Sequence, residues 1–258
     1  MRKTTSERFL RTAFDNLSLA ANGLRGRYRD AFESFARQRI NSYRQLISRY
    51  PTLRPAEKVV ALNLLAARAY HPSLHLLLTE VLSKNAEIAG MAAAALARIG
   101  SRKMLHRVLR LLKERKDAPS RLALVSALAL VADLGDSRSH AIWVDSLTAI
   151  LNNSSELEGC RALAAEGLAN ALRFCDRRTK RYRRSVDVIM RMLNDACAEV
   201  RFCSAFALGE LRVRKGLQKL REVAVHDHAK CSGLAGHPGG WTVSQEALEA
   251  ISAIRRER

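Results

Sequence analysis

The stretch of sequence that decides the fold runs Val200-Arg201-Phe202-Cys203-Ser204-Ala205-Phe206-Ala207-Leu208-Gly209-Glu210-Leu211. Counted from Val200, small residues occupy the middle, Ala-Leu stands at the seventh and eighth steps, and an apolar residue stands at the eleventh. Small and apolar residues in this spacing are typical of a helix packed closely on its neighbours. Gly and Pro are scarce, and no segment alternates apolar with polar residues, so we predict an all-α protein.

The same register recurs along the chain. It begins again at Ala56, Ile88, Ser120, Cys160 and Val243, at spacings of 32, 32, 40, 40 and 43 residues. The longer spacings contain longer connections, so the underlying unit is near 32 residues and has room for two helices. One helix pair cannot bury its apolar face alone, and the pairs must therefore stack. We predict a right-handed α-α superhelix, a solenoid of about six helix pairs over residues 53–258, with a long loop at 226–241.

The best unit resembles a known repeat. Asp195-Ala-Cys-Ala-Glu-Val200-Arg201, followed by Ala205-x-Ala207-Leu208-Gly209, is similar to the second helix of HEAT repeats of the short, bilin-lyase-like (PBS lyase HEAT-like) subfamily. The resemblance implies a HEAT-like solenoid. Ala89 and Ser244 stand where other units have Arg121, Arg161 and Arg201. We predict that these three arginines are structural and pair with Asp or backbone groups between units. The units with Ala89 and Ser244 are expected to lack this contact.

Residues 1–52 do not follow the register and are rich in aromatic residues. We predict an N-terminal helical hairpin that caps the first repeat, because the open end of a solenoid needs a cover. Its first helix is expected to begin at Ser6 and its second to end at Tyr50. The alternative is an aromatic hairpin that dimerises or docks a partner.

Composition narrows the remaining possibilities. The chain has 44 Lys plus Arg against 25 Asp plus Glu, a net charge of +19. The apolar stretches are too short to span a bilayer, and no apolar segment follows the basic N-terminus, so we expect a cytoplasmic protein without membrane segments. The five scattered cysteines are expected to be reduced and mostly buried.

Positive charge is densest after residue 172. The predicted partner-binding residues of this basic surface are Arg173, Arg177, Arg178, Lys180, Arg181, Tyr182, Arg183, Arg184, Arg212, Arg214, Lys215 and Lys219. The first eight are expected in one inter-helix connection and the last four one repeat later, on the same edge. Tyr182 is available to stack on a base or sugar. Lys103, Arg107 and Arg110 could extend the surface. The alternative is a solvated charge run that maintains solubility.

The long loop carries four potential metal ligands, His226, His228, Cys231 and His237. These residue types bind Zn²⁺ in tetrahedral sites, although their spacing matches no strong zinc motif. No other cofactor is expected. Without a metal, the loop is irregular, with Trp241 packed under it, and is a candidate partner contact.

Enzymatic motifs are missing from the sequence. There is no His-Glu dipeptide of the HEAT-like iron hydroxylases, no P-loop and no Gly-x-Ser-x-Gly. HEAT-like DNA glycosylases combine Trp with a carboxylate, but Trp143 and Asp145 are two residues apart and cannot share a helix face. We favour a non-enzymatic adaptor or scaffold that binds an acidic protein. The alternatives are a nucleic-acid-binding protein that contacts the phosphate backbone, and an enzyme of unassigned lyase or glycosylase-like type.

Overall fold

The computed structural model describes residues 9, 25–131, 134–231 and 240–256. Within these ranges the chain is helical and has no strand, although an isolated β-bridge joins Lys230 to Thr242. No described helix combines the length and the apolar character that crossing a membrane requires. The chain forms two compact units, Met1–Ile99 and Gly100–Arg258. This division falls inside the predicted repeat region, and the predicted boundary between residues 52 and 53 stays a prediction.

The first unit is a short stack of helices. It contains α2 (Arg25–Arg37), α3 (Tyr43–Arg49), the 3-10 turn η2 (Tyr50–Thr52), α4 (Pro55–Ala67), the 3-10 turn η3 (His71–Ser73), α5 (Leu74–Glu80) and α6 (Ala86–Ile99). Helix α2 packs on α4, and α4 packs on α6, against which α5 also lies. The hydroxyl of Tyr28 on α2 accepts a hydrogen bond from Asn63 on α4 at 2.7 Å.

The predicted hairpin at the N-terminus needs a correction. Its second helix is two helices, because the chain turns at Arg39, with φ of 56°, and Ser42 caps a new helix by accepting from the Gln45 amide at 3.2 Å. The predicted helix that starts at Ser6 lies outside the described residues except for Phe9. The Phe9 ring meets Tyr43 edge to face, with centroids 5.0 Å apart.

The second unit has two layers of helices. It contains α7 (Arg102–Glu114), α8 (Ala118–Ala129), α9 (Ser137–Asn152), α10 (Glu158–Leu172), α11 (Lys180–Met192), α12 (Ala198–Glu210), the 3-10 turn η4 (Arg214–Gly216), α13 (Leu217–His226) and α14 (Val243–Arg255). One layer runs α8, α10, α12 and α14, each packed on the next, and α7, α9 and α11 pack in sequence in the other. Each even-numbered helix also contacts its odd-numbered neighbour. The predicted all-α architecture of stacked helix pairs is confirmed.

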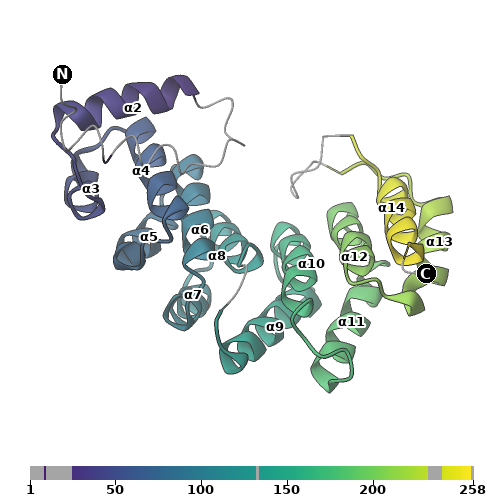
Figure 1. Ribbon diagram of the computed structural model, residues 1–258. Coiled ribbons are helices and arrows are strands. Elements are labelled where there is room, and N and C mark those ends of the chain that lie inside the picture. Colours follow the sequence, from purple (N-terminus) through teal and green to yellow (C-terminus); the bar gives the residue numbers. More distant parts are fainter. Residues whose placement is uncertain (1–8, 10–24, 132–133, 232–239, 257–258) are drawn as a thin grey trace. The chain divides into compact units, whose positions relative to one another are not determined.

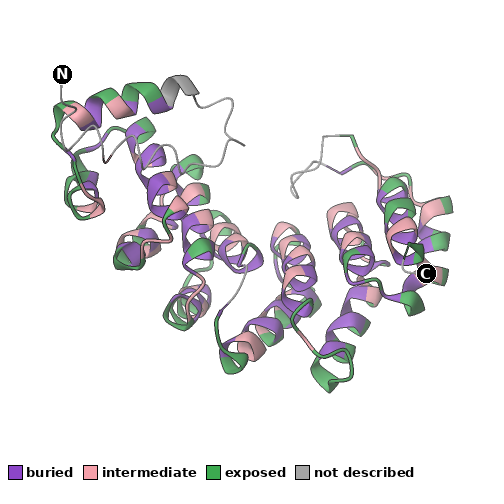
Figure 2. Ribbon diagram, viewed as in Figure 1, coloured by how far each residue is buried: buried purple, intermediate pink, exposed green. Residues whose placement is uncertain are grey.

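The sequence of each helix explains its layer. Helix α7 has a charged exposed face and a buried face of Met104, Leu105, Val108 and Leu112, which suits an outer position. Helices α10 and α12 are Ala-rich and buried around most of their circumference, as Figure 2 shows, because neighbours cover them on several sides. A Cβ added at Gly209 of α12 would lie 2.8 Å from the Ala250 Cα of α14. The small residues of the repeat register therefore permit a close approach between helices.

Three arginines link successive repeats. Each stands near the start of an even-numbered helix and pairs with a carboxylate in the connection that leads to the next one: Arg121 with Glu156, Arg161 with Asp195, and Arg201 with Asp227. We call these pairs the arginine ladder. Arg201 is bidentate to Asp227, at 2.6 and 3.0 Å, and also donates to the backbone oxygens of Asp195 and Ala196. The predicted structural role of these arginines is confirmed.

Candidate functional site

The basic segment lies at the junction of two repeats. Helix α10 ends at Leu172, and α11 begins at Lys180 after Thr179, whose hydroxyl caps the helix by accepting from the Tyr182 amide at 3.2 Å. The prediction that the whole segment lies in one connection was therefore wrong. Residues 180–184 are the first five residues of α11, because the Thr179 cap starts the helix in the middle of the charge run.

Several of the predicted cations are already paired with carboxylates. Arg173 pairs with Glu210, Arg181 with Asp145 at 2.9 Å, Lys215 with Asp187 at 2.6 Å and Lys219 with Glu222 at 3.0 Å. These pairs are at least one-third exposed, so each contributes little to stability and can open to admit an anion. The other predicted cations of α11 and the turn before it are exposed, and no ion pair engages them within the described residues: Arg177, Arg178, Lys180, Arg183 and Arg184.

A groove of about 610 Å³ brings two parts of the predicted surface together. Arg177 and Arg183 line it from the α11 side, and Arg212, Arg214 and Lys215 line it from the turn between α12 and α13. The buried side chains of Tyr182, Val186 and Val213 complete the lining. No carboxylate stands among these eight lining residues, although Lys215 pairs with Asp187, so cations gather in the groove beside apolar groups. We call it the basic groove.

The position of Tyr182 differs from the prediction. Its side chain is only 8% exposed, and burial raises the pKa of its hydroxyl. The ring faces inward because Tyr182 shares the buried side of α11 with Ser185, Val186 and Ile189. A ring held in this way packs against the side of the groove and is not available to stack on a nucleic-acid base.

The other predicted positions lie apart from the basic groove. Lys103, Arg107 and Arg110 line a separate hollow of about 400 Å³ on α7, together with Arg102 and His106. Helix α9 packs between α7 and α11, and on it the exposed Asp145 pairs with Arg181. Helix α9 therefore lies between the two basic regions, and a continuous basic surface stays a prediction.

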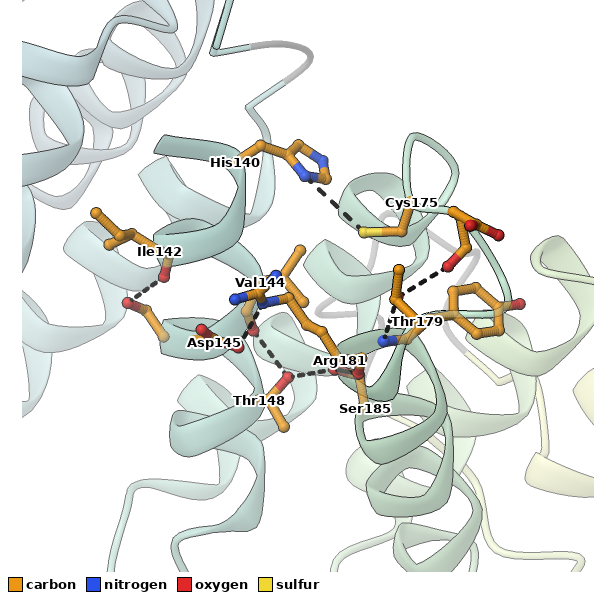
Figure 3. Close-up of polar contacts among 12 residues, drawn as sticks. His140, Ile142, Val144, Asp145, Thr148, Cys175, Thr179, Arg181 and Ser185 are labelled. Atoms are coloured by element: carbon orange, nitrogen blue, oxygen red, sulfur yellow. Dashed lines mark hydrogen bonds and ion pairs between the residues drawn. The ribbon is translucent and has the colours of Figure 1, made fainter. Parts of the chain in front are cut away.

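A second groove, of about 380 Å³, lies at the other side of the α10–α11 connection and contains a Cys–His pair that the sequence did not reveal. His140 Nε2 lies 2.9 Å from the Ala171 carbonyl oxygen, which can only accept, so Nε2 carries the proton. His140 Nδ1 then faces the Cys175 sulfur at 3.9 Å, as Figure 3 shows. Burial raises the pKa of the Cys175 thiol, which favours the thiol over the thiolate, so Cys175 is not an activated nucleophile.

The predicted metal ligands are separated by other roles. His226 and His228 are exposed, whereas Cys231 is buried and its pKa is raised to about 11, chiefly by burial. Asp227 between the two histidines belongs to the arginine ladder. His237 lies outside the described residues, and within the described part of the chain no three His, Cys, Asp or Glu side chains form a metal-binding group. The zinc site stays a prediction.

The loop itself is anchored at its base. The Cys231 amide donates to the Trp241 carbonyl oxygen at 2.9 Å, and the Val243 amide donates to Ala229 at 3.0 Å. These bonds join the two ends of the loop, next to the bridge between Lys230 and Thr242.

Comparisons with known proteins return only distant structural similarities. No protein-family model matches the sequence, and a search of curated proteins finds no match. A designed armadillo repeat protein is 16% identical, with a TM-score of 0.44 over 83% of this chain and 100% of that one. A computationally designed armadillo repeat protein for modular peptide recognition is 16% identical, with a TM-score of 0.44 over 82% of this chain and 99% of that one. A designed armadillo repeat protein in complex with the peptide (KR)4 is 17% identical, with a TM-score of 0.45 over 80% of this chain and 98% of that one. The repeat architecture therefore rests on this chain's own helix packing, and membership of the bilin-lyase-like subfamily stays a prediction.

Proposed function

We propose that this protein is a helical-repeat scaffold that binds an acidic segment of a protein partner in the basic groove. The observation that carries the proposal is the convergence of five cations from two adjacent repeats on one groove whose lining has no carboxylate. Such a surface attracts an acidic segment from a distance and orients it on contact. The ladder arginines are excluded from this role because each is held by a carboxylate in a pair whose side chains are at most 17% exposed.

The distribution of charge favours a short acidic segment over a nucleic acid. A phosphate backbone that continued beyond the groove would meet Asp145 and Asp187, two exposed carboxylates on α9 and α11. The only aromatic ring in the groove lining, Tyr182, is buried and offers no stacking surface. A local groove of this size suits a few extended residues with acidic side chains.

The experiment compares two variants with the same loss of charge. The groove variant replaces Arg177, Arg183, Arg212 and Arg214 with Gln. The matched control replaces Arg102, Lys103, Arg107 and Arg110 of α7 with Gln. Binding of a fluorescein-labelled oligoglutamate peptide is followed by anisotropy at several salt concentrations. We expect the groove variant to bind about tenfold more weakly than the wild type and the α7 variant to bind nearly as well.

Two outcomes would count against the proposal. Equal losses in both variants would show that binding follows net charge and not the groove. The protein could instead bind duplex DNA much more tightly than the peptide, with an affinity that falls with salt as steeply as the neutralisation of several phosphates requires. That result would favour nucleic acid.

A further inference from the structure

Two side chains of metal-binding types face each other in the second groove, at the α10–α11 connection. Cys175 comes from the connection and His140 from the first turn of α9, and both are half-buried and line the groove. His140 Nδ1 lies 3.9 Å from the Cys175 sulfur. The groove opens to solvent, so a small ion can reach both atoms.

The ring of His140 is held as the ring of a metal-binding histidine is held. Its Nε2 donates to the Ala171 carbonyl oxygen, at the end of α10, at 2.9 Å. A backbone acceptor on one ring nitrogen fixes the tautomer and leaves the lone pair of the other nitrogen free for a metal. The rings of Trp143 and Phe174 meet the His140 ring edge to face, with centroids 5.5 and 6.2 Å away, and hold its orientation.

The small number of ligands restricts the kind of ion. Among the residues that the structure describes, no third His, Cys, Asp or Glu completes a metal-binding group with this pair. The carboxylates that line the groove already act as caps, since Asp136 accepts from the Ser139 amide at 2.8 Å and Asp176 from the Arg178 amide at 2.9 Å. Their negative charge still favours a cation nearby.

A soft ion fits this pair better than a hard one. Zn²⁺ is normally held by three or four protein ligands, and Mg²⁺ and Ca²⁺ take oxygen ligands. Cu(I) binds thiolate sulfur and imidazole nitrogen, and two such ligands satisfy it. Bonds of about 2.3 Å to sulfur and about 2.0 Å to nitrogen, the lengths known for zinc, set the two atoms about 3.5–4.3 Å apart for angles between tetrahedral and linear. The observed 3.9 Å lies within this range.

We propose that Cys175 and His140 bind one Cu(I) ion between the sulfur and Nδ1. On binding, the thiol releases its proton to solvent and the sulfur bonds to the ion, so one proton leaves for each ion bound. The ion keeps its oxidation state, and no electron is transferred. The site lies apart from the basic groove and does not depend on the function proposed for that groove.

The experiment titrates the reduced, full-length protein with Cu(I) in the absence of oxygen, in competition with the coloured Cu(I) chelator bicinchoninate. The wild type is compared with Cys175→Ser, His140→Gln and Cys197→Ser. Cys197→Ser is the matched control, because Cys197 is also half-buried but its sulfur donates to Glu199 at 3.4 Å and faces no histidine. Urea unfolding shows whether each variant is folded.

We expect the wild type and Cys197→Ser to take up Cu(I) with the same affinity. Cys175→Ser should bind about a hundredfold more weakly and His140→Gln at least about tenfold more weakly, since each lacks one of the two ligands. Bound Cu(I) should protect Cys175 from iodoacetamide and leave Cys197 reactive. Zn²⁺ at the same concentration should protect Cys175 less, because two protein ligands leave its tetrahedral shell unfilled.

Three results would overturn the site. Uptake that Cys175→Ser leaves unchanged would place the ion elsewhere. Equal protection of Cys175 and Cys197 would show that Cu(I) binds accessible thiols without selection. Because His140 packs on Trp143, its variant could unfold, so nitrogen NMR of the wild type provides a separate test. The Nδ1 signal of His140 should shift when Cu(I) is added, and an unchanged signal would mean that His140 is not a ligand.

Discussion

Glu246 on α14 is a buried carboxyl group with an unusual pKa. Its side chain is 5% exposed, and burial, reinforced by the neighbouring Glu249, raises its pKa to about 7. A raised carboxyl pKa means that the folded protein binds the proton more tightly than the unfolded chain does. Stability from this group is therefore present below the unfolded pKa of about 4.5 and is lost as the pH rises through about 7.

Glu246→Gln should abolish the loss of folding stability that this carboxyl group causes at high pH. We expect the variant to be more stable than the wild type at pH 8, by at most a few kcal/mol, at about 1.4 kcal/mol per pKa unit. At pH 5 the two proteins should be similar. Urea unfolding at both pH values measures the difference, and Glu114→Gln at an exposed position of α7 is the control. A variant less stable than the wild type at pH 8 would contradict the assigned environment.

The cysteines give a second prediction at this scale. Burial raises the pKa of Cys160 to about 11 and raises that of Cys203 still further. Because the thiolate is the reactive form, both should resist alkylation at pH 7.5 in the folded protein. The half-buried Cys175 and Cys197 should react first. Mass-spectrometric mapping after timed iodoacetamide treatment tests the order, and labelling of Cys203 as fast as Cys175 would be inconsistent with it.

At the scale of helices, two helical glycines should respond in opposite ways. A Cβ at Gly209 would lie 2.8 and 2.9 Å from the Cα and Cβ of Ala250, on the next helix of the layer. Gly209→Ala should therefore push α12 and α14 apart and destabilise the protein by about 1–3 kcal/mol. At Gly90 of α6 a Cβ would meet nothing within 4 Å.

Gly90→Ala is the matched control for this prediction. It adds a methyl group in a helix without a clash and should stabilise the protein by about 0.5–1 kcal/mol, because alanine loses less conformational freedom on folding. The urea midpoints of both variants test whether the two substitutions change the stability in opposite directions. If Gly209→Ala were as stable as Gly90→Ala, the close approach of α12 and α14 would not be needed for packing.

The repeat elements could be predicted because their signal is local and repeated. Small residues at fixed steps indicated the packed helices, and arginines at equivalent positions indicated the ladder. The first repeat shows the limit of this reading. The turns after α4 and α12 are closed by equivalent hydrogen bonds, from the Tyr70 amide to Leu65 and from the Val213 amide to Leu208. These bonds align Leu65 with Leu208, whereas the predicted register placed Leu64 there, one residue earlier. Helix α4 is rich in Leu, Val and Ala, so a shift of one residue leaves an equally apolar pattern.

The basic groove could be predicted only in part. The sequence indicated its cations, and the repeat placed the two runs on neighbouring units. It did not indicate which cations are already paired, because Asp145, Asp187 and Glu210 lie 28 to 37 residues from their partners. The burial of Tyr182 depends on where Thr179 starts α11, which a charge run does not reveal. The positive φ of Arg212, 52°, is a property of the backbone and has no sequence signal of its own.

At the scale of the whole molecule, the net charge of +19 acts against folding. Like charges on a compact surface repel one another more than they do in an expanded chain. Salt screens exposed charges over a Debye length of about 10 Å at 0.1 M, whereas partly buried pairs are screened much less. The ladder pairs, with side chains 5–17% exposed, belong to the second group. Added salt should therefore weaken the repulsion more than it weakens the ladder.

We accordingly expect the urea midpoint of the wild type to rise as NaCl increases from about 0.01 M to about 0.3 M, since the Debye length shortens from about 30 Å to below 8 Å. The groove variant, which lacks four clustered cations, should be more stable than the wild type at low salt, and the gap should close at high salt. The α7 variant removes the same charge from another place and separates local repulsion from net charge. A wild-type midpoint that fell with salt would mean that surface ion pairs outweigh the repulsion. In that case an acidic partner that bound in the basic groove would not relieve repulsion among its cations.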